Sequence, residues 1–453
     1  MASAAEQLAQ NMSWSAFGKA KELQQRILFT LGLLIVYRIG TFIPMPGIDA
    51  DQLARFVEQT QGGILGIFNM FAGGAVGRMA IFALGIMPYI SASIIMQLMT
   101  SMVPHLEQLK KEGETGRKKI NQYTRYGTVL LATFQAYGIA VGLEGQGLAV
   151  DPGWFFRASA VITLVGGTMF LMWLGEQITA RGVGNGISLI IYVGIVAGLP
   201  AALAQFFELG RTGQIGAAVI VAILVGAVAV IAGVCFVERA QRRILIQYPK
   251  RQVGQKMYGG DSSHLPLKVN TAGVIPPIFA SSLLLLPTTI AGFSADGGGD
   301  ILATISALLG RGQPLFLAIF VGLIVFFSFF YTAVVFNPEE VAENLKKHGG
   351  FVPGIRPGKR TAEYLDYVLT RLTVVGAIYL SIVCVLPELL ISELAVPFYF
   401  GGTSLLIVVS VTMDFITQVQ SHLLAHQYGD LIEKSKLRGR GGRGGRAPAK
   451  GRR

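Results

Sequence analysis

The fold is decided by GGILGIFNMFAGGAVGR (residues 62–78) and by the segment that follows it directly, MAIFALGIMPYISASIIMQLMTSMV (residues 79–103). A membrane-spanning helix needs about 20 apolar residues, so the first segment is too short to cross a bilayer and the second is long enough. A half-helix at membrane depth is tolerated only where protein or a water-filled cavity encloses it. The stretch therefore predicts a membrane protein that encloses a space, and we interpret the short segment as the stopper of a pore.

The composition is that of an integral membrane protein. Of the 453 residues 52% are apolar and 14% are charged, and the mean hydropathy is +0.54. Soluble domains carry about 25% charged residues. Residues 1–26 contain no apolar core with a cleavage site, so we expect no removable signal peptide. Ten segments are long enough to span a membrane, and they begin near Ile27, Met79, Gly127, Trp154, Ile187, Ile215, Ala272, Pro314, Leu372 and Val396.

The basic residues predict the orientation of the chain. An even number of spans places both termini on one side of the membrane. All but six of the 38 Lys and Arg residues fall on that side, and the exceptions are Arg38, Arg55, Arg78, Arg157, Arg211 and Arg311. Short loops rich in Lys and Arg stay in the cytoplasm. The formal charge of +12 is thus a property of the inner face, which should attract anionic lipid, nucleic acid or an acidic protein surface.

The chemistry that is missing argues against two other classes of protein. Ion-coupled transporters and intramembrane hydrolases need ionisable groups at membrane depth. Here the ionisable groups of the spans lie toward the span ends: Arg38, Glu388, Glu176, Glu238 and Asp414. The sequence has neither an HExxH motif nor a Gly-x-Ser-x-Gly elbow. Cys235 and Cys384 lie inside spans without ligands at metal-binding spacing, so we predict no metal and no cofactor.

The cytoplasmic loops carry several local signals. Residues 104–125 read as a charged turn, and residues 175–186 as a tight helix-to-helix turn without GxGxxG spacing. Residues 242–248 and 255–258 predict a possible small hairpin. Asn337 is a candidate N-cap for a short helix that begins at Pro338. FVPGIRPGKR, residues 351–360, predicts a basic tip stiffened by proline.

Two isoleucine pairs have helical spacing. Ile86 and Ile90 share one helix face, as do Ile187 and Ile191. Spacing alone favours lipid contact or helix packing over pore lining for such pairs.

Five motifs give the chain a family resemblance. FALGIMPYISASI (82–94), GTMFLMWLGEQITARGVGNGIS (167–188), SSHLPLKVN (262–270), FVPGIRPG (351–358) and PFYFGGTSLLIVV (397–409) closely resemble the SecY family, the central subunits of the bacterial protein-conducting translocon. The resemblance extends to about residue 436 and leaves the Arg- and Gly-rich tail outside it.

The resemblance implies an all-α integral membrane protein with ten transmembrane helices in two pseudo-symmetric five-helix halves. The halves are related as an inverted repeat and surround a central hourglass pore. The expected domains are a cytoplasmic N-terminal segment (1–26), a first half (27–205) with a plug (62–78), and a second half (206–436). Large cytoplasmic loops cover residues 238–270 and 337–371, and residues 437–453 form a basic disordered tail.

The resemblance also assigns residues to roles. The pore ring is Ile86, Ile90, Ile187, Ile191, Ile278 and Ile407. The plug contains Ile64, Leu65, Ile67, Phe68, Asn69, Met70 and Phe71. Gln97 and Asn270 are candidates beside a lateral gate between the second and seventh spans, with ordinary interhelical hydrogen bonding as the equal alternative. Contacts with the SecA motor or the ribosome would come from Arg242, Arg243, Lys250, Arg251, Arg356, Lys359 and Arg360.

A passive polypeptide channel in the bacterial cytoplasmic membrane is thus the predicted function. Its expected partners are SecE, SecG, the SecA ATPase, the ribosome, preproteins with their signal peptides, and anionic lipid. A solute transporter is the main rival, and an intramembrane hydrolase is a remote one. Nucleotide hydrolysis by the purified chain alone would contradict a passive channel.

Overall fold

The computed structural model describes residues 20–49, 52–53, 69, 72–213, 216–248, 251–253, 256–258, 262–293, 313–394 and 402–441. Helices lie at all ten places where spans are predicted, which confirms the helical multi-span fold. These helices are α3 (Lys21–Gly40), α6 (Met87–Met102), α8 (Glu114–Gly145), α9 (Trp154–Arg181), α10 (Gly186–Arg211), α11 (Ala217–Arg239), α12 (Ile275–Phe293), α14 (Pro314–Val335), α16 (Lys359–Leu394) and α17 (Gly402–Gly441). Within the described ranges, length and composition allow seven helices to cross a membrane: α8, α9, α10, α11, α14, α16 and α17.

The second span differs from its prediction. Residues 72–86 form turns, so neither a half-helix that runs to residue 78 nor a helix that starts at residue 79 is correct. The backbone is left-handed at Gly73, Gly74, Gly85 and even Met79, which a helix cannot accommodate. The helix begins only at Met87, with a proline in its first turn. Its 16 residues reach about 24 Å, less than the hydrocarbon thickness, and the turns precede it.

The predicted charged turn at residues 104–125 is also largely helical. Helix α7 (Pro104–Lys111) follows α6 after a single residue, and α8 begins at Glu114. The chain reverses at Gly113, whose φ is +77°. A Cβ atom on Gly116 would lie 1.7 Å from the Leu109 carbonyl oxygen, so only glycine lets the two helices meet this closely.

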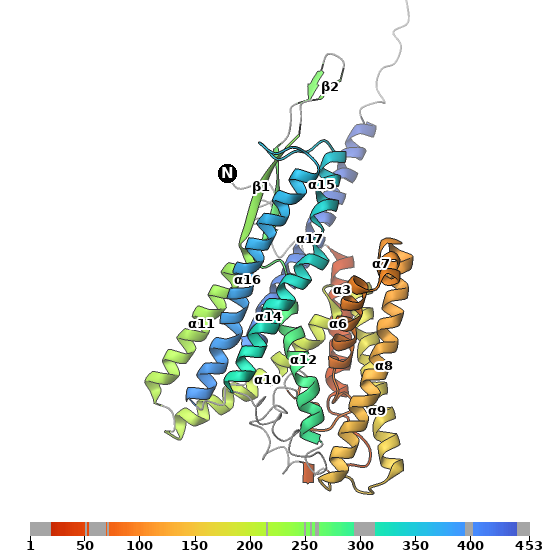
Figure 1. Cartoon of the computed structure of the whole chain (residues 1–453), viewed down its shortest axis with the longest axis vertical. Coiled ribbons are helices and arrows are strands. Elements are labelled where there is room, and N and C mark those ends of the chain that lie inside the picture. Colours follow the sequence, from red (N-terminus) through yellow and green to blue (C-terminus); the bar gives the residue numbers. More distant parts are fainter. Residues whose placement is uncertain are drawn as a thin grey trace, which may run out of the picture.

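The helices form two groups that follow the order of the chain (Figure 1). In the first group α8 packs against α6 and α9, and α9 also contacts α3 and α10. In the second group α14 packs between α12 and α16, while α17 contacts α16 and α11. The groups meet where α10 packs on α17 and where α12 packs on α6 and α8. There are thus two seams between the halves, one on each side of the shared core.

A small folded unit stands at the end of the second group where α11 (Ala217–Arg239) ends and α16 (Lys359–Leu394) begins (Figure 1). Strand β1 (Gln241–Gln247) pairs antiparallel with β4 (Ser262–Lys268), and β2 (Arg251–Val253) pairs with β3 (Lys256–Tyr258). The predicted pairing of residues 242–248 with 255–258 is therefore wrong. Helix α15 (Pro338–Lys347) is capped by Asn337, whose side chain accepts from the backbone of Glu339 and Glu340, which confirms that prediction.

Candidate functional site

An apolar cluster at the junction of the two halves contains all six predicted ring isoleucines. Five of them are 0–7% exposed, and Ile187 is half-buried against the same cluster. They come from four elements. Ile86 is the N-cap of α6, Ile90 lies within α6, Ile187 and Ile191 lie in α10, Ile278 lies in α12 and Ile407 lies in α17. The cluster therefore joins residues from both halves of the bundle, and Ile86 and Ile407 in it are more than 300 positions apart in the sequence.

Charged side chains of the described helices form several ion pairs. The ion pairs found among the described residues are Arg26–Glu22, Lys111–Glu107, Arg125–Glu176, Arg157–Glu144, Arg211–Glu208 and Lys347–Glu343. Except for Arg125, which lies about three turns into α8, these residues stand near helix ends or in connecting segments. Glu176 follows Gly175, where a Cβ atom would lie 3.1 Å from Ile187, so the Arg125–Glu176 pair borders the isoleucine cluster.

The tight turn predicted for residues 175–186 is shorter than expected, because α9 continues to Arg181 and α10 begins at Gly186. The start of α10 is held by side chains from three helices. The backbone N–H of Val183 donates to Oγ1 of Thr30 on α3 at 3.1 Å, and that of Gly184 donates to Oε1 of Gln418 on α17 at 2.9 Å. The N–H of Gly186 donates to Oγ1 of Thr179 on α9 at 2.9 Å. Asn185 caps the new helix. These bonds fix the place from which Ile187 and Ile191 project.

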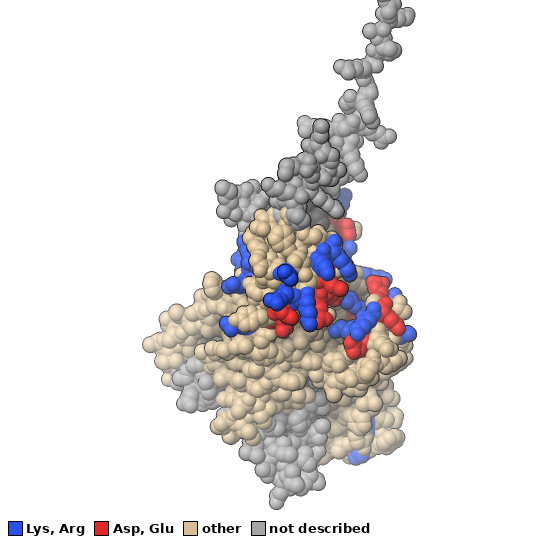
Figure 2. Space-filling model, turned by 45° about the horizontal axis from the view of Figure 1, so that its top comes forward, with Lys and Arg blue, Asp and Glu red and all other residues tan. Residues whose placement is uncertain are grey.

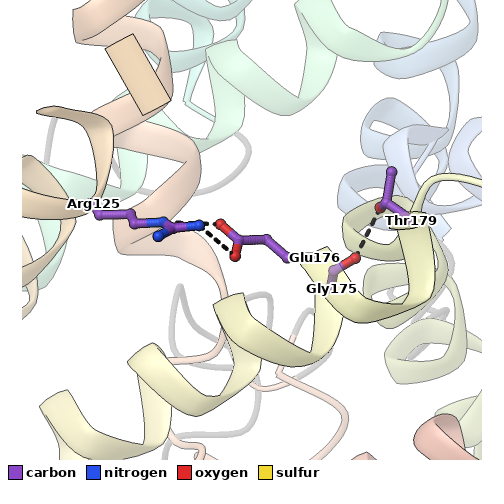
Figure 3. Close-up of polar contacts among 4 residues, drawn as sticks. All are labelled: Arg125, Gly175, Glu176 and Thr179. Carbon is purple, nitrogen blue, oxygen red and sulfur yellow. Dashed lines mark hydrogen bonds and ion pairs between the residues drawn. The ribbon is translucent and has the colours of Figure 1, made fainter. Parts of the chain in front are cut away.

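The end of α9 approaches α10 and is tied to α8 (Figure 3). Arg125 donates two hydrogen bonds to the Glu176 carboxylate, at 3.1 and 2.7 Å, and so joins α8 to α9. The Thr179 hydroxyl donates to the carbonyl oxygen of Gly175 at 2.8 Å. A Cβ atom on Gly186 would lie 2.0 Å from that same oxygen, so α9 and α10 touch backbone to backbone.

The front seam, between α6 and α12, contains a contact that the sequence did not reveal. The Ser282 hydroxyl on α12 donates to the Ile278 carbonyl oxygen of its own helix at 2.8 Å, and its Oγ lies 3.5 Å from Sδ of Met87 on α6. The predicted gate residues do not meet each other. Gln97 donates to Ser93 within its own helix at 3.5 Å. The Asn270 amide donates to Glu238 at 2.8 Å and also bonds the backbone of Gly273, all within the second half.

The predicted docking residues stand on the small folded unit formed by β1, β4, α15 and the start of α16. Arg242 and Arg243 are exposed on β1, and Arg356, Lys359 and Arg360 are exposed where α16 begins. An apolar core under them includes Ile244, Leu267, Val352, Leu365 and Leu369, so loops far apart in sequence form one body. Lys250 lies outside the described residues, and of Arg251 only the backbone is described.

Acidic and basic side chains alternate over this end of the molecule (Figure 2). On α7, hydrogen bonding to Lys111 and its positive charge lower the pKa of Glu107. This end of the molecule therefore carries both charges at neutral pH, and basic residues predominate at residues 356–360.

The predicted plug falls mostly outside the described residues. Ile64, Leu65, Ile67, Phe68, Met70 and Phe71 are not described. Asn69 is described, and it binds the turn that follows it. Its carbonyl oxygen accepts from the Gly74 N–H and its Oδ1 accepts from the Gly77 N–H, both at 2.7 Å.

Two groups of membrane-crossing helices that close on an apolar cluster, with a folded unit at one end, define a multi-span helical membrane channel. A model of the SecY family matches residues 80–416. The translocase subunit SecY of Escherichia coli K12 is 58% identical over 432 residues, which are 94% of this chain and 98% of that relative. The chain therefore belongs to the SecY family. It is a protein-conducting channel of the Sec translocase, and not an enzyme.

Solved structures show the same fold. One described as a protein-conducting channel superposes with a TM-score of 0.64 at 18% identity, over 88% of this chain and 92% of its own. Sec61 in a canine ribosome-channel complex from the endoplasmic reticulum superposes with a TM-score of 0.63 at 19% identity, over the same shares of the two chains.

Proposed function

We propose that the isoleucine cluster is the constriction through which this channel conducts unfolded preproteins. The observation that carries the proposal is the convergence of six isoleucines from both halves in one apolar core. A narrow apolar constriction excludes water and ions by dewetting. Contacts with aliphatic side chains are not directional, so the same ring can widen around a passing chain without binding it tightly.

The test compares buried and lipid-facing isoleucines. Replacing Ile86 and Ile191 by serine hydrates the constriction, so we expect a higher resting ion conductance in planar bilayers. Ile162, which is 73% exposed on α9, is the matched control, and Ile162→Ser should leave the conductance unchanged. Equal conductance of the two variants would remove the ring from the mechanism.

Covalent capture tests the path itself. A preprotein with one cysteine, stalled during transport, should form a disulfide with Ile278→Cys. It should not do so with Ile378→Cys, because Ile378 is exposed on the outer surface of α16. Capture at residue 378 but not at residue 278 would place the path elsewhere.

The front seam is the proposed lateral exit for apolar segments. Its support is that α12 packs on α6 and α8 with the Ser282–Met87 contact between the halves. Gln97 and Asn270 remain proposed members of the gate surroundings, where each makes only contacts within its own half. A plug within residues 62–78, seated from outside, is proposed on the family resemblance.

The basic cytoplasmic unit is the proposed docking place for SecA and for the ribosome. Exposed Arg242, Arg243 and Arg356 on a folded core support this, and a canine relative of the fold is part of a ribosome-channel complex. SecE and SecG are the proposed small subunits. We further place the chain in the bacterial cytoplasmic membrane, with both termini inside and anionic lipid beside the basic loops.

A further inference from the structure

Residues 72–86, between Asn69 and α6, are mostly buried against the surrounding helices, and we call them the wall. Ala75, Ala80, Ala83 and Leu84 are almost fully buried. Part of the stretch belongs to the core that holds the ring isoleucines, and part belongs to the core between α8 and α9. A segment with so little exposed surface has no free side from which to move.

The preceding outer segment is paired with this wall. The Met45 N–H donates to the Met79 carbonyl oxygen at 2.8 Å, and the Ile81 N–H donates to the Ile43 carbonyl oxygen at 3.0 Å. These bonds flank an antiparallel bridge between Pro44 and Ala80. Residues 43–45 of the same polypeptide are therefore hydrogen-bonded along the wall.

Arg38, near the outer end of α3, reaches the beginning of the wall. Its Nη1 donates to the Gly73 carbonyl oxygen at 2.6 Å, and Nη2 of Arg78 donates to the same oxygen at 3.3 Å. The Cζ atoms of Arg38 and Arg78 lie 4.8 and 4.1 Å from the centre of the Phe42 ring. Among the described residues neither guanidinium forms an ion pair with a carboxylate. The Gly73 carbonyl is therefore an acceptor that both cations share, and Arg38 makes a second, longer bond of 3.4 Å to Oγ1 of Thr41 on its own segment.

The shape of the turn at Gly73 makes this anchor specific. Its φ of +66° favours glycine, and a Cβ atom there would lie 2.8 Å from the Tyr37 hydroxyl oxygen and 3.2 Å from the Gly194 Cα atom of α10. The carbonyl is thus presented to Arg38 by a turn that is backed by α3 and α10. Asn69 closes the other side of this turn.

We infer that residues 72–86 are a fixed part of the outer channel wall and not of the plug, and that Arg38 is the positioning residue that fastens this wall to α3. The inference rests on the proposed function, and it shortens the proposed plug so that it ends before Ala72. Because the wall leads directly into Ile86, loosening it should disturb the constriction.

A disulfide tests whether the wall moves. Pro44 and Ala80 form a non-hydrogen-bonded antiparallel pair, whose Cα atoms are typically about 4.5 Å apart, within the range that a disulfide accepts. Pro44→Cys and Ala80→Cys are combined in a parent with Cys235→Ser and Cys384→Ser. We expect the oxidised channel to transport a preprotein at the same rate as the reduced channel, within about twofold.

Three outcomes are distinguishable. Equal transport in both redox states supports a fixed wall. Transport that stops on oxidation and returns on reduction overturns the wall and leaves the channel function intact. No transport in either state, with a parent that is equally inactive, contradicts the proposed function itself.

Substitution of Arg38 tests its positioning role. Arg38→Met should raise resting ion leak about tenfold, the size expected for one lost hydrogen bond to a charged group, while transport of normal preproteins persists. Arg38→Lys keeps a donor for the Gly73 carbonyl and should give an intermediate leak. The control is Arg211→Met, because Arg211 is an exposed residue paired only with nearby Glu208. A leak that is unchanged in Arg38→Met, or equal in the Lys and Met variants, overturns the assignment.

Discussion

The hydrogen bond between Gly184 and Gln418 joins the first half of the channel to the second half where α10 packs on α17. This contact between the halves is called the back seam. The backbone N–H of Gly184, in the turn before α10, donates to Oε1 of Gln418 on α17 at 2.9 Å. If the halves separate when the channel opens, this bond is present only in the closed state. Gln418→Leu removes the acceptor and preserves much of the side-chain volume.

The size of the effect follows from ordinary hydrogen-bond energies. A neutral hydrogen bond contributes about 0.5–1.5 kcal/mol net, so its loss shifts the closed–open equilibrium about twofold to tenfold toward open. Where the open form is a minor species, the resting leak rises by the same factor. Gln418→Glu keeps an acceptor oxygen and makes the bond charge-assisted, which is about twice as strong. That variant should leak less than the parent.

Ion conductance of channels in planar bilayers, without motor or substrate, measures this equilibrium. The matched control is Gln420→Leu, two residues further along α17; both glutamines are exposed, so the control also shows the effect of adding an apolar side chain at the surface. We expect the order of leak to be Gln418→Leu highest, the parent and Gln420→Leu equal, and Gln418→Glu lowest. If Gln418→Leu and Gln418→Glu change the leak in the same direction, the bond does not hold the back seam.

Three further predictions concern the packing and the cytoplasmic face. Gly186→Ala places a Cβ atom 2.0 Å from the Gly175 carbonyl oxygen and should destabilise the fold by about 1–3 kcal/mol in thermal unfolding, whereas Gly198→Ala meets open space and should not. Asn337→Ala removes the cap of α15 and should cost about 1 kcal/mol, seen as faster amide hydrogen exchange in that helix alone. Arg356→Glu reverses a charge on the exposed tip and should reduce SecA-driven transport into vesicles while the melting temperature is unchanged; normal transport would show that the tip is dispensable.

The positions of the helices could be predicted because each one is marked locally. Apolar length places α8 to α11, α14, α16 and α17, and Asn337 with Pro338 marks the start of α15. Residues 72–86 were misassigned because buried turns and buried helices have the same apolar composition. The left-handed backbone at Gly73, Gly74, Met79 and Gly85, which sequence does not display as such, separates the two.

Contacts that join distant segments could not be predicted from one sequence. Gly184 and Gln418 are 234 residues apart, and neither carries a local signal. Ser282 lies four residues after Ile278, on the same helix face, so its proximity to the apolar cluster could have been inferred once Ile278 was placed. Its contact with Met87 needed the packing of α12 on α6. The partner of β1 was missed because β4 lies beyond a second small hairpin.

The contact between Ser282 and Met87 bears on which segments the proposed lateral exit would admit. The contact is weak and the surrounding interface is apolar, so separating α6 from α12 would lose mainly dispersion attraction. An apolar helix that entered between α6 and α12 would pack against both of them and so replace the lost contacts. A hydrophilic segment would replace them poorly. Selection of substrate segments by hydrophobicity would then need no specific binding pocket, because the entering helix takes over the contacts that α6 and α12 made with each other.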